Sequence, residues 1–319
     1  MENKVPELIY HYTSYDKLQY ILKNGTLRFK ESTESNDMLD TIAMVEILKK
    51  LKFPEIENHK DIQAARDFML DYFRRDEYQR RHDSLVSCFS VKGDSRLLWD
   101  AYTMNRPSNI PCEYGLTKYC YDSQLKYNGV CIAFKTEKLK KTIQNLEGYI
   151  CQRGYVLPIL YGTTYIESVI NEWVIEACQM VMELSKDEDQ SQNLIPEMRI
   201  PFLRSTMTLK KSIVYPMIEF IGKIEAFSPF FKHEFWCEED EIRMSLCIDK
   251  MKDNSQVQSL NGAMYYDVPI TPECIDHVIL GPEFAEEEIQ KIKDHKEYIL
   301  NFMDFKLIES QGTGVIRSN

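Results

Sequence analysis

Residues 9–29 read IYHYTSYDKLQYILKNGTLRF, and this stretch predicts how the fold begins. The apolar run at 7–12 is typical of a short buried strand. Ser14 is a good helix N-cap, and Gly25 suits the position just after a helix C-terminus. One helical face between them is apolar, formed by Leu18, Ile21 and Leu22. We therefore expect a strand, a helix and a second strand at 26–29, in that order.

The rest of the chain alternates strand and helix patterns, which predicts an α+β fold. Further strands are expected at 84–91, 127–135, 154–162, 241–249, 264–270 and 274–282. Helical periodicity is expected at 40–82, 95–103, 136–146, 164–227 and 283–303. Strands separated by helical segments favour one α+β domain over residues 1–319, with helical insertions at about 41–82 and 164–227.

Composition excludes several classes of protein. The chain has 319 residues, a formal net charge of −11 and no apolar run of about 18 residues, so we expect no membrane span. The first residues, MENKVPEL, lack a signal-peptide pattern, which predicts a cytoplasmic protein. The nine cysteines form no C-x-x-C pair, which argues against a zinc site, any other metal centre and a disulfide framework. The negative charge disfavours non-specific nucleic-acid binding.

His11 stands at the end of the first expected strand, just before a helix cap. A lone histidine among apolar residues is more often a packed core side chain than a catalytic one. Strand ends and the loops that follow them are, however, where functional sites are commonly built. Both interpretations of His11 stay open from the sequence alone.

Two other segments contain candidate residues. In CFSVKGDSRLLWDAYT, Trp99 and Tyr102 are three apart on an expected helix, so they form either a core aromatic pair or a stacking surface for a ligand ring. In KHEFWCEEDEIRM, an acidic run precedes a strand. Such a run is usually a solvated surface, but a strand-borne carboxylate such as Glu241 can stabilise a developing positive charge in a cleft.

Taken in order, these motifs resemble the domain-of-unknown-function 2971 family of bacterial and phage-associated proteins. The resemblance runs from Tyr10 to Pro282 and depends on YHYTS, ILKNGTLRF, ND, CFS, LLWDAYT, GVCIAF, EEDEIR and VILGP. The chain departs from the family pattern in two ways. Ile242 stands where the family usually has an aromatic residue, and the two helical insertions match poorly.

That family in turn resembles the ADP-ribosyltransferase fold of the His–Tyr–Glu class. The resemblance implies a split, mixed or antiparallel sheet core, with NAD as substrate and no metal. It makes His11, Tyr102 and Glu241 the catalytic residues, with Glu239 as the alternative glutamate because side chains two apart on a strand share a face.

The resemblance also implies which residues bind NAD. His11 would hold the nicotinamide ribose, and Thr13 would lie beside the nicotinamide amide. Arg28 would pair with the pyrophosphate, although an exposed strand arginine explains it equally well. Asn36 and Asp37 would cap the pocket, or simply form a turn. The remaining members of the predicted NAD site are Tyr12, Ser90, Trp99 and Tyr102.

The function implied is NAD cleavage, either as an ADP-ribosyltransferase or as an NAD glycohydrolase, through a ribosyl cation like that of glycoside cleavage. Proteins of this type often act as toxins, defence effectors or phage-borne modifiers. That role implies a macromolecular acceptor, protein or nucleic acid, and a cognate inhibitor. Two alternatives remain: a non-catalytic module that binds a nucleotide or a protein, and an enzyme that modifies nucleic acid.

Overall fold

The computed structural model describes the chain in segments. These are residues 5–31, 47, 60–75, 84–103, 129–148, 150–151, 153–186, 210–248, 256–260, 262–284, 286–294 and 306–312. Their contacts divide the chain into two compact units. The first comprises residues 1–30, 85–159 and 237–319, and the second comprises residues 31–84 and 160–236. The prediction of a single domain with two helical insertions stays a prediction.

The first unit begins as the opening stretch predicts. Strand β1 (Leu8–Thr13) is followed by helix α1 (Tyr15–Asn24) and strand β2 (Thr26–Glu31). The Ser14 hydroxyl accepts a hydrogen bond from the Lys17 amide at 3.4 Å, which caps the helix. Gly25 ends it with φ 60°, a left-handed conformation that glycine adopts without steric cost. The predicted N-cap and C-terminal glycine are both confirmed.

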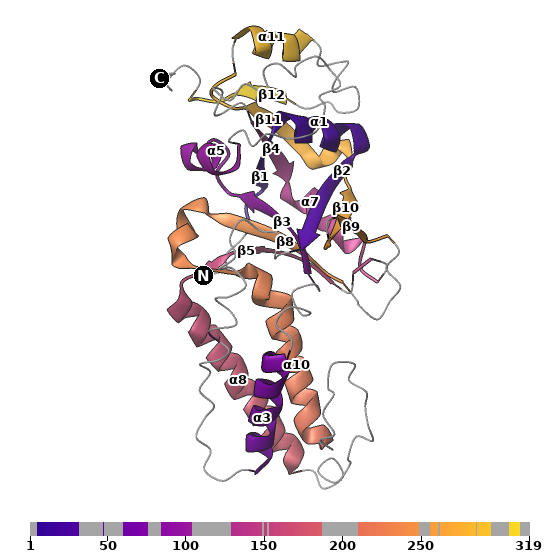
Figure 1. Ribbon diagram of the computed structural model, residues 1–319, viewed down its shortest axis with the longest axis vertical. Coiled ribbons are helices and arrows are strands. Elements are labelled where there is room, and N and C mark those ends of the chain that lie inside the picture. Colours follow the sequence, from indigo (N-terminus) through magenta and orange to yellow (C-terminus); the bar gives the residue numbers. More distant parts are fainter. Residues whose placement is uncertain are drawn as a thin grey trace. The chain divides into compact units, whose positions relative to one another are not determined.

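A mostly antiparallel sheet forms the centre of this unit (Figure 1). Its order is β12-β11-β4-β1-β3-β2-β10-β9, and β8 pairs with both β3 and β5. Strand β3 therefore has three neighbours, and the sheet branches there. The strands not yet given are β3 (Ser84–Ser90), β4 (Val130–Lys135), β5 (Arg153–Pro158), β8 (Glu241–Cys247), β9 (Gln258–Leu260), β10 (Ala263–Pro269), β11 (Ile275–Leu280) and β12 (Lys306–Glu309). The predicted α+β class is confirmed.

The two faces of this sheet are packed differently. One, called here the core face, carries the large apolar cluster that includes Ile9, Phe89, Ile132 and Met244. Helix α1 covers it with Leu18 and Leu22, α7 (Thr136–Gln144) with Leu139 and Ile143, and α11 (Glu286–Asp294) with Ile289 and Ile292. The opposite face, called here the outer face, carries a small cluster that includes Tyr12, Trp99 and Cys131. Helix α5 (Arg96–Tyr102) packs there.

The second unit is mainly helical. Helices α3 (Lys60–Arg75), α8 (Thr163–Ser185) and α10 (Lys211–Phe227) lie side by side around their own apolar cluster (Figure 1). Asp61 accepts hydrogen bonds from the Ser185 hydroxyl at 2.9 Å and the Lys210 ammonium at 3.0 Å. Short elements complete the unit: β6 (Leu160–Tyr161), η3 (Ser228–Phe230), β7 (Phe231–Lys232) and the start of η4 (Glu234–Glu239). In the described part of the chain, no helix combines the length and the apolar character needed to cross a membrane.

Several predicted boundaries need correction. The single strand expected at 154–162 is two strands, because β5 pairs with β8 while β6 pairs with β7 in a separate two-stranded sheet. Strands β9 and β12 were not predicted, and the short 3-10 turn η5 (Pro272–Cys274) precedes β11. Only the α3 part of the helix expected at 40–82 and the α11 part of the helix expected at 283–303 are described as helices of several residues.

Candidate active site

Tyr102 and Glu239 meet on the outer face of the sheet. The Tyr102 hydroxyl, at the end of α5, donates a hydrogen bond to the Glu239 carboxylate at 2.6 Å. Glu239 is buried. Burial of the hydroxyl raises the pKa of Tyr102, and the negative charges of Glu239 and Glu241 raise it further. Tyr102 is therefore a protonated donor at every physiological pH, and both carboxylates lie close enough to act on it.

Glu241 lies beside this pair and is held by Arg243. The Arg243 Nε contacts one carboxylate oxygen at 2.5 Å and its Nη2 contacts the other at 3.2 Å. The two residues are two apart on β8, so their side chains share a face. The Glu241 side chain is 5% exposed and that of Arg243 is 1% exposed. Such a buried bidentate pair compensates the carboxylate charge and engages both of its oxygens.

These four side chains are called here the tyrosine–glutamate cluster: Tyr102, Glu239, Glu241 and Arg243. Two carboxylates and one phenol hydroxyl converge in it from the end of α5, the end of η4 and the start of β8. Carboxylates that are fixed in place and largely removed from water can stabilise a developing cation. The cluster thus brings together Tyr102, Glu241 and the alternative Glu239, three of the residues that the sequence predicts for the site.

His11 is not part of this cluster. Its Nδ1 lies 2.9 Å from the Cys88 carbonyl oxygen, and because a carbonyl can only accept, Nδ1 carries the proton. Its ring centroid is 5.7 Å from that of Phe89. Burial lowers the pKa of His11 and outweighs the hydrogen bond to Cys88, which acts the other way. The imidazole is a neutral side chain packed against the core.

Strand alternation explains why His11 and Glu241 are apart. In the β1–β4 pair, Ile9 lies opposite Phe134 and His11 opposite Ile132, and Ile9, Phe134 and Ile132 all belong to the cluster on the core face. On β8 the residues of that cluster are Ile242, Met244 and Leu246, so Glu241 projects to the outer face. Strand alternation thus places His11 on the core face and Glu241 on the outer face, and a shared role in binding NAD stays a prediction.

Trp99 also needs correction. It is 2% exposed, its ring lies 4.8 Å from that of Tyr12, and its indole N–H donates to Asp94 at 2.7 Å. It belongs to the outer-face apolar cluster and offers no stacking surface to a ligand. Tyr12 has a structural role too, because its hydroxyl donates to the Lys92 carbonyl at 2.9 Å and accepts from the Ser95 amide at 2.9 Å.

The other predicted NAD-binding residues lie in different places. Thr13 is buried on the core face with His11, opposite Val130 of β4. Ser90 donates its hydroxyl proton to the Glu239 carbonyl at 2.7 Å, so it contacts the segment that carries the cluster. Asn36 and Asp37 lie outside the described residues.

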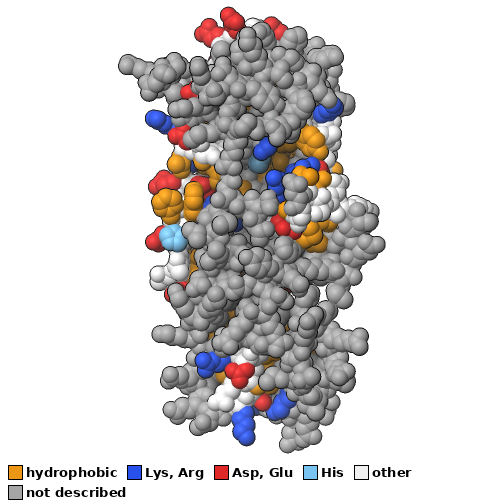
Figure 2. Space-filling view, viewed as in Figure 1, with side chains coloured by type: hydrophobic (Ala, Val, Ile, Leu, Met, Phe, Trp, Pro, Cys, Tyr) orange, Lys and Arg blue, Asp and Glu red, His pale blue; other side chains and the backbone are white. Residues whose placement is uncertain are grey.

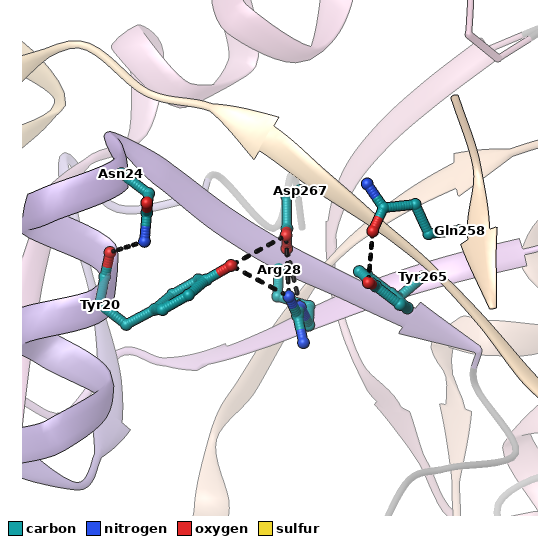
Figure 3. A network of polar contacts seen from close by, with 6 residues as sticks. All are labelled: Tyr20, Asn24, Arg28, Gln258, Tyr265 and Asp267. Carbon is teal, nitrogen blue, oxygen red and sulfur yellow. Dashed lines mark hydrogen bonds and ion pairs between the residues drawn. The ribbon is translucent and has the colours of Figure 1, made fainter. Parts of the chain in front are cut away.

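Arg28 lies in a separate network on β2 and β10 (Figure 3). Its Nε and Nη2 each lie 2.8 Å from an oxygen of Asp267. The guanidinium is 4.1 Å from the centre of the Tyr265 ring, and Nη2 donates to the Tyr20 hydroxyl at 3.3 Å. The fork predicted to pair with a pyrophosphate is thus bidentate with a protein carboxylate, which is the role of an arginine that holds strands together.

Sequence reasoning missed Lys92, which contacts the segment before β8. Its ammonium lies 2.9 Å from the Asp240 carboxylate. The sequence offered one weak signal for this contact, the opposite charges of a lysine in a tight turn and an acidic run far along the chain. No fixed spacing in the sequence links the two. In the described part of the chain, no three His, Cys, Asp or Glu side chains are placed to hold a metal ion.

A family model matches residues 117–244, and its description is "Protein of unknown function (DUF2971)". The matched stretch contains Glu239, Glu241 and Arg243, while His11 and Tyr102 precede it. The matched stretch is shorter than the span from Tyr10 to Pro282 over which the motifs resemble the family. No curated protein and no solved structure is similar enough to this chain to count as a match. The resemblance to this family that the motifs predict is thus confirmed over residues 117–244.

Proposed function

We propose that this chain cleaves the nicotinamide–ribose bond of NAD, as an ADP-ribosyltransferase or an NAD glycohydrolase, with the tyrosine–glutamate cluster at its centre. The observation that supports this is the 2.6 Å hydrogen bond between Tyr102 and Glu239, with Glu241 on the same face. An aromatic residue and a carboxylate, which the proposed reaction uses, thus meet from separate segments.

Bond cleavage in this proposal passes through a ribosyl cation, which a nearby carboxylate stabilises. Glu239 is our candidate for that role, because its carboxylate accepts the hydrogen bond from the aromatic residue, Tyr102. Tyr102 then contributes its ring against nicotinamide and its hydroxyl to the orientation of Glu239. His11 is assigned to packing, since it belongs to the core face.

The same proposal includes an ADP-ribosyltransferase-like split sheet. Its support is the branching at β3, which pairs with β1, β2 and β8. A role as a toxin or defence effector follows only from this activity, as do a macromolecular acceptor and a cognate inhibitor. A carboxylate that stabilises the cation serves transfer and hydrolysis equally, so NAD itself is the first substrate to test.

The test is release of nicotinamide from NAD by the full chain, followed by chromatography. We expect Glu239→Gln to lower kcat by about 10²–10³-fold, the usual effect of removing one preorganised electrostatic group. Tyr102→Phe should lower it less. Glu286→Gln, an exposed residue of α11, is the matched control and should behave like the wild type. Absence of nicotinamide from the folded wild type, or full activity of Glu239→Gln, would exclude the proposal.

A non-catalytic nucleotide-binding module is the second candidate. It is favoured by the pairing of Glu241 with Arg243, which leaves that carboxylate compensated rather than available to a cation. Such a module would raise its melting temperature in the presence of NAD or another nucleotide, since a ligand that binds only the folded state stabilises it. A thermal shift without nicotinamide release would favour this candidate.

An enzyme that modifies nucleic acid has weaker support. The net charge of −11 opposes binding to phosphates, which depends on lysine and arginine. Acidic and basic side chains both appear on the described part of the face in Figure 2. Labelling of RNA or DNA by NAD with a radioactive adenylate phosphate, with protein as the competing acceptor, would separate this candidate from protein modification.

A further inference from the structure

Three consecutive backbone carbonyls just before β8 are each held by a donor from the end of β3. The Glu238 carbonyl accepts from the Lys92 ammonium at 2.6 Å, and the Glu239 carbonyl accepts from the Ser90 hydroxyl at 2.7 Å. The Asp240 carbonyl accepts from the Val91 amide at 3.1 Å. The middle residue of this set, Glu239, carries the carboxylate that contacts Tyr102.

The backbone at Asp240 has an unusual conformation. Its φ is 43°, and among the described residues it alone has a positive φ without being glycine. Aspartate tolerates this left-handed region better than most residues, but it persists only where the surroundings enforce it. Lys92 supplies that enforcement from its side chain, because the ammonium that contacts the Glu238 carbonyl also contacts the Asp240 carboxylate at 2.9 Å.

Lys92 is itself firmly anchored. Its amide donates to the Ser90 hydroxyl at 3.0 Å, and its carbonyl accepts from the Tyr12 hydroxyl at 2.9 Å. The same Tyr12 oxygen accepts from the amide of Ser95, the residue just before α5. The Tyr12 hydroxyl on β1 therefore fixes both the backbone of Lys92 and the start of α5, the helix that ends at Tyr102.

We propose that Lys92 is a positioning residue, whose ammonium holds residues 238–240 so that the Glu239 carboxylate meets the Tyr102 hydroxyl. Lys92 acts on the backbone carbonyl of Glu238 and the side chain of Asp240, one residue to either side of Glu239, and does not contact the reacting atoms. The catalytic meaning of this role rests on the proposed function, but the geometry does not.

The geometric arm of the test uses 3-fluorotyrosine incorporated into the full chain and 19F NMR. Tyr102→Phe assigns the Tyr102 resonance by its disappearance. We expect Lys92→Met to move that resonance toward the position of an exposed tyrosine, and Lys92→Arg to leave it near the wild-type position. Lys138→Met is the matched control. It removes an exposed lysine of α7, whose ammonium lies 2.9 Å from the Glu273 carboxylate. An unmoved Tyr102 resonance in Lys92→Met would overturn the proposal.

The kinetic arm measures nicotinamide release by the same variants. We expect Lys92→Met to lower kcat on the order of 10–100-fold, as small displacements of a catalytic group do, with the KM for NAD changed less than about twofold. Lys92→Arg should recover most of kcat. A variant that raises KM and leaves kcat unchanged would assign Lys92 to substrate binding and overturn the positioning role.

A second variant makes the test independent of any general loss of folding. Asp240→Asn keeps a residue that tolerates the left-handed conformation and removes the charge that pairs with Lys92. It should move the Tyr102 resonance in the same direction as Lys92→Met does, but by a smaller amount. An unmoved resonance would contradict the proposed positioning role of Lys92. If the wild type releases no nicotinamide but the resonance responds as described, the proposed function fails while the positioning role stands.

Discussion

The core face and the outer face of the sheet place polar groups under opposite conditions. On the core face, His11 is a neutral ring among apolar side chains with one backbone carbonyl as partner. On the outer face, Glu241 and Arg243 are buried as charges that compensate one another, next to Tyr102 and Glu239. The difference teaches that strand parity, rather than the order of motifs along the chain, decides which side chains form a site.

The largest expected effect is on the outer face, where removing one partner leaves a buried charge. Arg243→Met should lower the free energy of unfolding by about 3–5 kcal/mol, because the buried Glu241 carboxylate then loses the cation that contacts both of its oxygens. The double variant Arg243→Met/Glu241→Leu should recover most of the loss. Urea denaturation measures both values. A loss below about 1 kcal/mol in the single variant would show that water reaches Glu241, contrary to its burial.

Tyr102→Phe should have the next largest effect. It removes the hydroxyl that donates to the buried Glu239 carboxylate and should cost about 1–3 kcal/mol of stability. Tyr165→Phe, on a tyrosine that is 57% exposed, is the matched control and should change stability by less than about 0.5 kcal/mol. Equal values for the two variants would mean that the Tyr102 hydroxyl is hydrated rather than buried against Glu239.

On the core face, the effect should depend on pH. The folded pKa of His11 is lowered, so the unfolded chain binds more protons than the folded chain as the pH falls through the ordinary histidine pKa of about 6.5. The histidine contribution is thus fully favourable above that pH and is lost below it. His11→Phe removes one hydrogen bond, worth about 1 kcal/mol, and removes this pH dependence.

Denaturation of the wild type and His11→Phe at pH 7.5 and pH 5.5 therefore gives a clear comparison. The stability of the wild type should fall more between the two pH values than that of the variant. Any other titrating group contributes equally to both proteins and cancels. Parallel pH profiles would place His11 in contact with water, and a steeper fall in the variant would contradict the lowered pKa.

The smallest effect is expected at Arg28, on the outer face of β2. Leu27 and Phe29 point into the core-face cluster, so Arg28 projects to the other side, where its side chain is 31% exposed. Arg28→Lys loses the bidentate contact with Asp267 and the stacking on Tyr265, yet should cost less than about 1 kcal/mol because solvent screens the pair. If Arg28→Lys lowered stability as much as Arg243→Met does, solvent exposure would not explain the difference expected between the two arginines.

Much of the fold could be predicted from local pattern. The first strand, the Ser14 cap, the Gly25 stop and the strands at 84–91 and 241–249 depend on neighbours in sequence, and the structure confirms them to within a residue or two. The break between β5 and β6 could not be predicted, because it depends on which distant strand each half pairs with.

The candidate site could be predicted only in part. Tyr102, Glu239 and Glu241 were all named from sequence, and they do come together. The face that His11 occupies depends on its register with Ile132, which no local pattern specifies. The burial of Trp99 against Tyr12 and the contact of Lys92 with residues 238–240 are likewise long-range, so neither could be read from residue type alone.

The two links within the tyrosine–glutamate cluster differ in how far they reach along the chain. Glu241 and Arg243 are two residues apart, so their charges meet without the closure of a long loop. Tyr102 and Glu239 are 137 residues apart, and contacts of such separation close late in folding because the loop between them is entropically costly. During synthesis Tyr102 is therefore present long before its carboxylate partner, and the complete cluster exists only in the finished protein.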